Sequence, residues 1–193
     1  MFNLYSFLAY IFVTAYTPGP NNIMSMSNAI KSGFRKSLPF NLGIFVGFSI
    51  VMGFCTLFSA TLYQVLPSIK PVMLILGAAY ILYLAWKTFK SSGDIEISDS
   101  HSHSFMQGLF LQFINPKIII YGITSMSTYI LPHFESVPIL IGFAILLAFV
   151  GFTGTLCWAW FGAAFHTLFT TYSKMINITM SLLLLYCAVS LFF

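Results

Sequence analysis

The chain has 193 residues, of which 59% are hydrophobic and only 6% are charged. Because soluble domains carry roughly a quarter charged residues, this composition excludes an ordinary water-soluble protein and predicts a surface that faces lipid. The net charge of +4 comes from dispersed basic residues, which excludes the concentrated basic surface of a nucleic-acid-binding protein. The apolar stretches are too long for barrel strands of about 10 residues, so we predict an all-α integral membrane protein.

Apolar stretches recur along the chain at the length that lets a helix cross a bilayer, about 20 residues. Segments rich in proline, glycine, serine or charge separate them, and the longest of these covers 91–104. The first apolar stretch lacks the basic start of a secretion signal, so we interpret it as an uncleaved span. We predict six transmembrane helices at 3–28, 38–61, 70–89, 106–131, 137–165 and 174–193.

The basic residues predict how these spans are oriented. Loops on the cytoplasmic side of a membrane protein carry the excess of lysine and arginine. Only Lys70 falls in the second and fourth loops, whereas six basic residues fall in the other three. We therefore expect both termini outside and the following residues at the cytoplasmic side: Lys31, Arg35, Lys36, Lys87, Lys90 and Lys174.

Proline interrupts the first and the fourth predicted spans. The first contains T-P-G-P-N-N at 17–22, and the fourth contains I-N-P-K at 114–117. Proline removes a backbone donor and clashes with the preceding turn, so each motif should break its helix. Dividing the chain into 1–96 and 97–193 places the breaks at matching positions of two three-span halves. Because an odd number of spans inverts the second half, we predict one transmembrane domain of two inverted three-helix repeats.

Matching breaks in inverted halves are a sequence sign of a transporter site, because the opened backbone can hold ions and polar substrates. Two other interpretations stay open. Proline and glycine also form ordinary kinks in membrane helices, and Lys117 could snorkel to the interface or cap helix carbonyls. We predict that substrate binds at the residues of the two motifs, which are Pro18, Gly19, Pro20, Asn21, Asn22, Asn115, Pro116 and Lys117.

Charge within the spans limits the substrate. None of the predicted spans contains Asp or Glu, so a second positive charge on the substrate would find no counter-charge. Lys117 and open helix N-termini suit a carboxylate. Carbonyls, asparagine amides or aromatic faces suit an ammonium, and the aromatic candidates are Tyr80, Tyr83 and Tyr121. We expect a small zwitterionic amino acid with a neutral side chain.

Coupling to protons would need a group that can release one within the membrane. Desolvation disfavours a charged lysine, which makes Lys117 the leading candidate for a proton carrier. His166 is the other candidate, although its position at the end of the fifth predicted span favours an interfacial role.

Three motifs resemble those of the LysE/RhtB family of amino-acid exporters. They are T-P-G-P-N at 17–21, N-P-K at 115–117 and G-A-A-Y-I-L-Y-L-A-W-K at 77–87. The resemblance extends over the whole chain and, within the family, is greatest to exporters of cysteine and O-acetylserine. It implies export of small neutral amino acids through the bacterial inner membrane by proton-coupled secondary transport with alternating access. We expect no cofactor, metal or nucleic acid; the partners are the substrate and the bilayer, and a homo-oligomer stays open.

A solute channel is the alternative function. Six spans with inverted half-helices also describe a pore, although a fixed lysine is an unusual lining for neutral solutes. An enzyme is not expected, because the chain lacks G-x-S-x-G, H-E-x-x-H and paired membrane aspartates.

Overall fold

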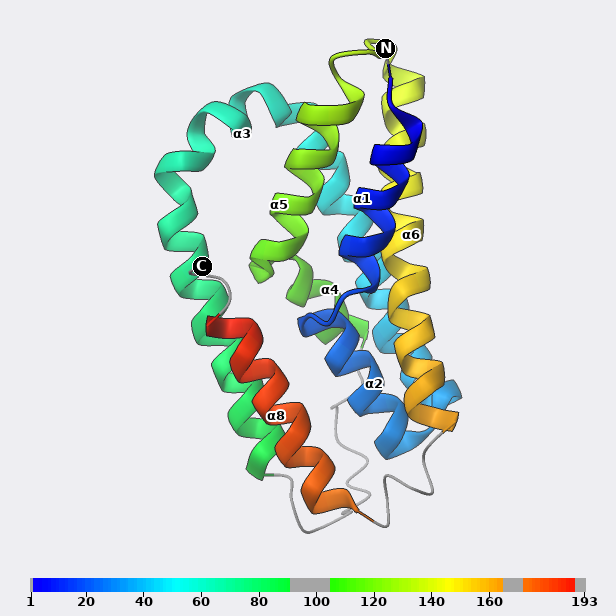
Figure 1. The fold of residues 1–193 in the computed structure, drawn as a ribbon, viewed down its shortest axis with the longest axis vertical. Coiled ribbons are helices and arrows are strands. Elements are labelled where there is room, and N and C mark those ends of the chain that lie inside the picture. The colour runs from blue at the N-terminus through cyan, green and yellow to red at the C-terminus, as the bar shows by residue number, and fades with distance from the viewer. Residues whose placement is uncertain (1, 91–104, 165–171, 190–193) are drawn as a thin grey trace.

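The computed structural model describes residues 2–90, 105–164 and 172–189, and every regular element in these ranges is a helix. The predicted all-α architecture is therefore confirmed for the described residues, which form an elongated bundle (Figure 1). The elements are α1 (Leu4–Tyr16), α2 (Pro20–Ser32), α3 (Phe34–Lys90), α4 (Phe105–Ile114), α5 (Pro116–Thr124), the π-helix η1 (Ser125–Ile130), α6 (Val137–Ala164) and α8 (Ser173–Val189).

Figure 1 shows how the helices run between the two ends of the bundle. α1 and α2 descend in succession from the N-terminus, and α3 rises from the lower end, bends over at the top and descends. α4, α5 and η1 then rise, α6 descends, and α8 rises. Successive passes thus run in alternating directions, as they do in multi-pass membrane proteins. The six-span arrangement with inverted repeats stays a prediction.

Two of the predicted loops are shorter or absent in the structure. The segment 31–37 reduces to Gly33, whose φ of 83° reverses the chain between α2 and α3 in a conformation that favours glycine. The segment 67–71 keeps a helical backbone, so α3 continues from Phe34 to Lys90 and reverses by bending (Figure 1). A proline removes only one backbone hydrogen bond, and a bend accommodates that loss without ending the helix.

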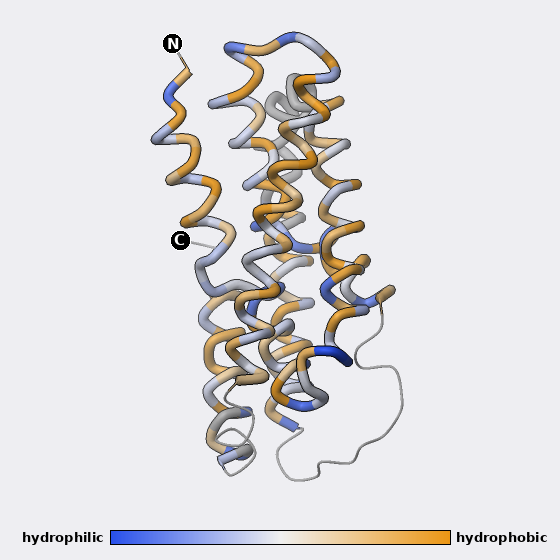
Figure 2. Tube along the Cα trace, turned by 90° about the vertical axis from the view of Figure 1, so that its right-hand side faces the viewer, coloured by the Kyte–Doolittle hydropathy of each residue, from blue (hydrophilic) through white to orange (hydrophobic). Residues whose placement is uncertain are grey.

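The outside of the bundle is apolar. Trp160, for example, is 66% exposed, and Figure 2 shows hydrophobic residues along nearly the whole length of the helices. Two described helical segments are long and apolar enough to cross a membrane: Phe34–Phe58, which is the first part of α3, and Val137–Ala164, which is α6. The helices Phe105–Ile114 and Pro116–Ile130 form a third span if the bent pair is taken as a single crossing of the membrane. Because apolar surface on this scale is unfavourable in water, the chain is a multi-pass membrane protein.

Buried apolar side chains form two separate clusters. One contains residues of α1, α3, α5, η1 and α6, and the other contains residues of α2, α3, α4 and α8. The breaks between α1 and α2 and between α4 and α5 therefore lie where the two clusters meet. Gly43 and Gly108 bring α3 and α4 so close that an added Cβ on either would meet the backbone of the facing helix.

Candidate functional site at two broken helices

The first break separates α1 from α2. α2 begins with Pro20, which suits the first helical position because its missing N–H would be unpaired anyway. The last carbonyls of α1 have no partner within that helix. The Asn22 amide donates to two of them, the carbonyls of Ala15 at 2.9 Å and Thr17 at 2.8 Å. The predicted break is confirmed, and an asparagine of its own motif stabilises it.

The second break separates α4 from α5 and η1, with a bend of 63°. Asn115 is the N-cap of α5, and its Oδ1 accepts a hydrogen bond from the Lys117 N–H at 3.1 Å. Pro116 occupies the first helical position of α5, as Pro20 does in α2. Two half-helices therefore begin inside the bundle, and their N-termini carry partial positive charge.

Buried side-chain amides connect the two breaks. Asn21 in α2 and Gln112 in α4 hydrogen-bond to each other twice, at 2.7 Å and 3.2 Å. Asn115 donates to the same Asn21 oxygen at 3.2 Å, and Gln112 also donates to the Gly108 carbonyl at 2.8 Å. Asn21, Gln112 and Asn115 are at most 6% exposed. Because each amide has both donors and an acceptor, they satisfy one another without burying a charge.

The Lys117 ammonium caps the C-terminal end of α1. Its Nζ donates to the Thr17 carbonyl at 3.1 Å and to the Thr17 hydroxyl at 3.0 Å. The side chain passes over Gly19, where an added Cβ would lie 3.0 Å from Nζ. The C-terminal end of a helix carries partial negative charge, so α1 attracts the ammonium without a carboxylate. Carbonyl capping, one of the interpretations that the sequence leaves open, is the contact that Lys117 makes in this structure.

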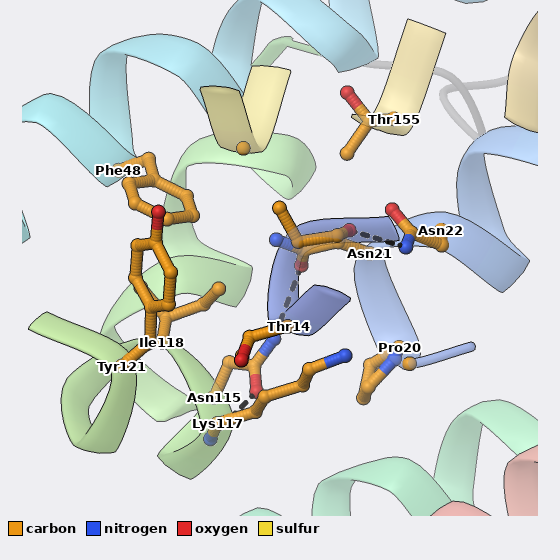
Figure 3. Close-up of a pocket in the computed structure, with 13 residues that line it drawn as sticks. Thr14, Pro20, Asn21, Asn22, Phe48, Asn115, Lys117, Ile118, Tyr121 and Thr155 are labelled. Atoms are coloured by element: carbon orange, nitrogen blue, oxygen red, sulfur yellow. Dashed lines mark hydrogen bonds between the residues drawn. The ribbon is translucent and has the colours of Figure 1, made fainter. Parts of the chain in front are cut away.

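A small cavity lies at this junction, with walls from α1, α2, α3, α5 and α6. Figure 3 shows the Lys117 side chain extending toward Pro20 across it. The space open to the centre of a water molecule is about 20 Å³, which holds on the order of one water. In this conformation the volume is therefore too small for an amino acid. The lining residues are Thr14, Ala15, Gly19, Pro20, Asn21, Asn22, Phe48, Asn115, Lys117, Ile118, Tyr121, Gly151 and Thr155.

Most of the residues predicted from the two motifs meet at this cavity. Pro18 is exposed and Pro116 packs against Gly77, so neither of these prolines lines it. Tyr121 lines the cavity, whereas Tyr80 and Tyr83 do not. The six motif residues in its wall are Gly19, Pro20, Asn21, Asn22, Asn115 and Lys117. Their contact with a substrate stays a prediction, and His166 lies outside the described residues.

Several residues of the site belong to no sequence motif that predicts them. Phe48 reaches the cavity from α3, and Gly151 and Thr155 reach it from α6. Gln112 is the residue of the amide network that the sequence analysis misses. Its one available signal is that it is a polar residue in an apolar stretch, and polar side chains inside membrane helices usually have a functional or structural partner.

Comparison with known proteins covers nearly the full chain. The family model described as LysE type translocator matches residues 12–193, which include every residue that lines the cavity. Similar proteins include the cysteine/O-acetylserine efflux proteins of Escherichia coli strain K12 and Shigella flexneri serotype 5b strain 8401. Each is 41% identical over 190 residues, which are 98% of this chain and 97% of the relative. No solved structure matches the chain significantly.

Proposed function

Because the chain belongs to the LysE type translocator family, we propose that it exports small neutral amino acids, such as cysteine and O-acetylserine, from the bacterial cytoplasm across the inner membrane. The efflux proteins that are 41% identical to it support this substrate class. The observation that carries the proposal is the meeting of two broken helices, with their asparagines and Lys117, at one cavity inside an apolar bundle. Secondary transporters bind substrate at such breaks. The proposed activity is transport without chemical change of the substrate, not enzymatic catalysis.

The proposed topology has six spans in two inverted three-helix repeats, 1–96 and 97–193, with both termini periplasmic. The directions of α2 and α5 support the inversion, because both begin with a proline near the cavity and run to opposite ends of the bundle (Figure 1). The orientation is supported by the α2–α3 turn, the end of α3 and the start of α8. These three places lie at the same end (Figure 1) and hold six of the eight basic residues, as the cytoplasmic side should.

The contact between Lys117 and Thr17 suggests how a zwitterion binds. In this structure the lysine ammonium donates to the Thr17 carbonyl. A substrate carboxylate offers Lys117 a charged acceptor, and the substrate ammonium then offers the released Thr17 carbonyl a charged donor. Hydrogen bonds with an ionised partner are stronger than neutral ones. The substrate thus replaces an internal contact of Lys117, and the Thr17 carbonyl also keeps its hydrogen bond from Asn22.

The surroundings of the cavity favour a neutral substrate side chain. Phe48, Ile118 and Tyr121 form much of its wall. Of the acidic residues, the structure describes Glu135 alone, which is exposed between η1 and α6. A second cation on the substrate would therefore lack a carboxylate among the described residues of the site, and burying an unpaired charge is strongly unfavourable.

Lys117 is also the proposed carrier of the coupled proton. Lys117→Gln keeps a hydrogen-bonding side chain but cannot titrate, so efflux should no longer depend on the pH gradient. Losing a hydrogen bond to a charged group costs about 1.5–3 kcal/mol, which lowers transport at limiting substrate by roughly 10- to 100-fold. Lys117→Arg is the control that keeps the charge. Normal proton-dependent efflux by Lys117→Gln would rule out both roles of the lysine.

Reconstitution into proteoliposomes separates the exporter from the channel. An exporter gives saturable flux of O-acetylserine and counterflow, in which unlabelled substrate on one side drives uptake of labelled substrate from the other. A channel gives flux proportional to the gradient and no counterflow. Flux of that second kind, or equal transport of lysine and O-acetylserine, would overturn the proposed function.

A further inference from the structure

Buried polar atoms without partners are concentrated on the half-helices that begin at the two breaks. Folded proteins pair the large majority of such atoms, so each exception calls for a physical explanation. The described part of the chain has five such atoms. Four of them lie on α2 or on α5 and η1, and the fifth lies on α3. The five atoms are Ser25 Oγ, Asn28 Nδ2, Asn41 Oδ1, Tyr121 OH and Ser125 Oγ.

The unpaired groups occupy similar positions on the two half-helices. Each half-helix has a proline at its first helical position. Ser25 and Tyr121 both follow their proline by five residues, and Asn28 and Ser125 follow it by eight and nine residues. At 3.6 residues per turn, these positions fall one turn apart on a single face of each helix. Ser25 and Tyr121 thus share one spacing from their prolines, and the second pair differs by a single residue.

Each face also contains a polar residue of the cavity. Asn21 stands one turn before Ser25, and Lys117 stands one turn before Tyr121. Asn21, Lys117 and Tyr121 all line the cavity (Figure 3). α2 runs from there to the end of the bundle where Gly33 joins it to α3, whereas α5 and η1 run to the opposite end (Figure 1). The cavity is therefore the point from which two polar faces lead in opposite directions.

Neighbouring helices seal both faces in this conformation. On the α2 side, the two hydrogen bonds between Asn21 and Gln112 hold α2 against α4, and Ser25 is completely buried. On the α5 side, Tyr121 stacks on Tyr10 of α1, with 6.1 Å between ring centroids. This sealing leaves the polar atoms unpaired. Water or a polar substrate would supply their missing hydrogen bonds once the helices separate.

We propose that these two faces line the two access paths of an alternating-access cycle. The α2 face lines the path to the end where α2 meets α3, and the face of α5 and η1 lines the path to the opposite end. This inference rests on the transport function proposed above. Hydration of its polar face stabilises each open state relative to the closed one, so the unpaired groups assist opening. The lining residues are Asn21, Ser25 and Asn28 on one path and Lys117, Tyr121 and Ser125 on the other.

Matched cysteine variants test the two paths. Ser25→Cys and Ser125→Cys each change one side-chain atom, and both are made with the exposed Cys157 replaced by alanine. A membrane-impermeant methanethiosulfonate reagent is applied to intact cells or to inside-out vesicles. Because only one path opens at a time, Ser25→Cys should react roughly tenfold faster from the cytoplasmic side. Ser125→Cys should react roughly tenfold faster from the periplasmic side.

Ile23 and Ile123 provide controls on the same half-helices but away from the polar faces. Both are buried, at 0% and 2% exposure, so Ile23→Cys and Ile123→Cys should stay unmodified from either side. The inference is wrong if both serine variants react from one side only, if neither reacts while efflux persists, or if the controls react equally fast. O-acetylserine efflux is measured for every variant. Active efflux without sided labelling overturns only the two-path inference, whereas a parent chain without efflux overturns the transport proposal.

Discussion

Replacing Gln112 should weaken the junction of the two broken helices. Gln112→Leu keeps a similar side-chain size but removes the acceptor of the Asn21 amide and the donor to the Gly108 carbonyl. The Asn21 oxygen keeps its hydrogen bond from Asn115, so one buried donor is left without a partner. An unpaired buried donor costs about 1–3 kcal/mol. We expect the free energy of unfolding to fall by that amount.

Thermal unfolding of the detergent-solubilised protein measures this loss. For chains of this size, 1 kcal/mol corresponds to about 2–4 °C in the unfolding temperature, which predicts a decrease of roughly 2–12 °C for Gln112→Leu. Phe113→Leu is the matched control, because Phe113 is the next residue of α4 but is 41% exposed. Its unfolding temperature should stay close to that of the unaltered chain.

A double variant tests the stated cause of the loss. Combining Asn21→Leu with Gln112→Leu removes both partners of the reciprocal pair, so no Asn21 amide remains buried without an acceptor. The double variant should therefore lose less stability than the sum of the two single variants. The reasoning is refuted if Gln112→Leu unfolds at the temperature of the unaltered chain, or if the two single losses simply add.

Two further substitutions test the packing of the breaks. In Gly77→Ala the new Cβ would lie 2.6 Å from the rigid ring of Pro116, so the unfolding temperature of this variant should fall. Gly142→Ala, which has no neighbour within 4 Å, should leave the same measurement unchanged. Asn22→Ala removes two hydrogen bonds to the last carbonyls of α1 and should cost about 1–3 kcal/mol of unfolding free energy. Hydrogen exchange should then increase selectively in the last turn of α1, and protection equal to that of the unaltered chain would contradict this assignment.

The sequence predicts the two breaks correctly because proline acts locally. Pro20 and Pro116 remove backbone donors wherever the helix is placed, and each has a neighbouring asparagine that satisfies freed backbone groups. The same local signal overestimates the interruption at 67–71, where α3 stays helical. Whether proline ends a helix or only bends it depends on how the neighbouring helices pack, and the sequence does not display that packing.

The contacts between the breaks could not be predicted, because they join residues far apart in the chain. Lys117 and Thr17 are separated by 100 residues, and Asn21 and Gln112 by 91. Motif spacing indicates which residues are polar within a span, but not which polar groups meet. The sequence therefore left the role of Lys117 open between substrate binding, proton transfer and helix capping, and only the structure identifies its hydrogen-bond partner.

That partner determines how easily the site can exchange its contacts. A buried lysine paired with a carboxylate is costly to separate, because either ion alone is left unsolvated. Lys117 instead donates to the carbonyl and hydroxyl of Thr17 at the end of a helix, and a substrate carboxylate is a stronger acceptor than either. The amides of Asn21 and Gln112 are likewise neutral, so separating α2 from α4 exposes no charge. The junction is held by several hydrogen bonds that an amino acid or water could replace, so the proposed transport cycle could open it without separating an ion pair.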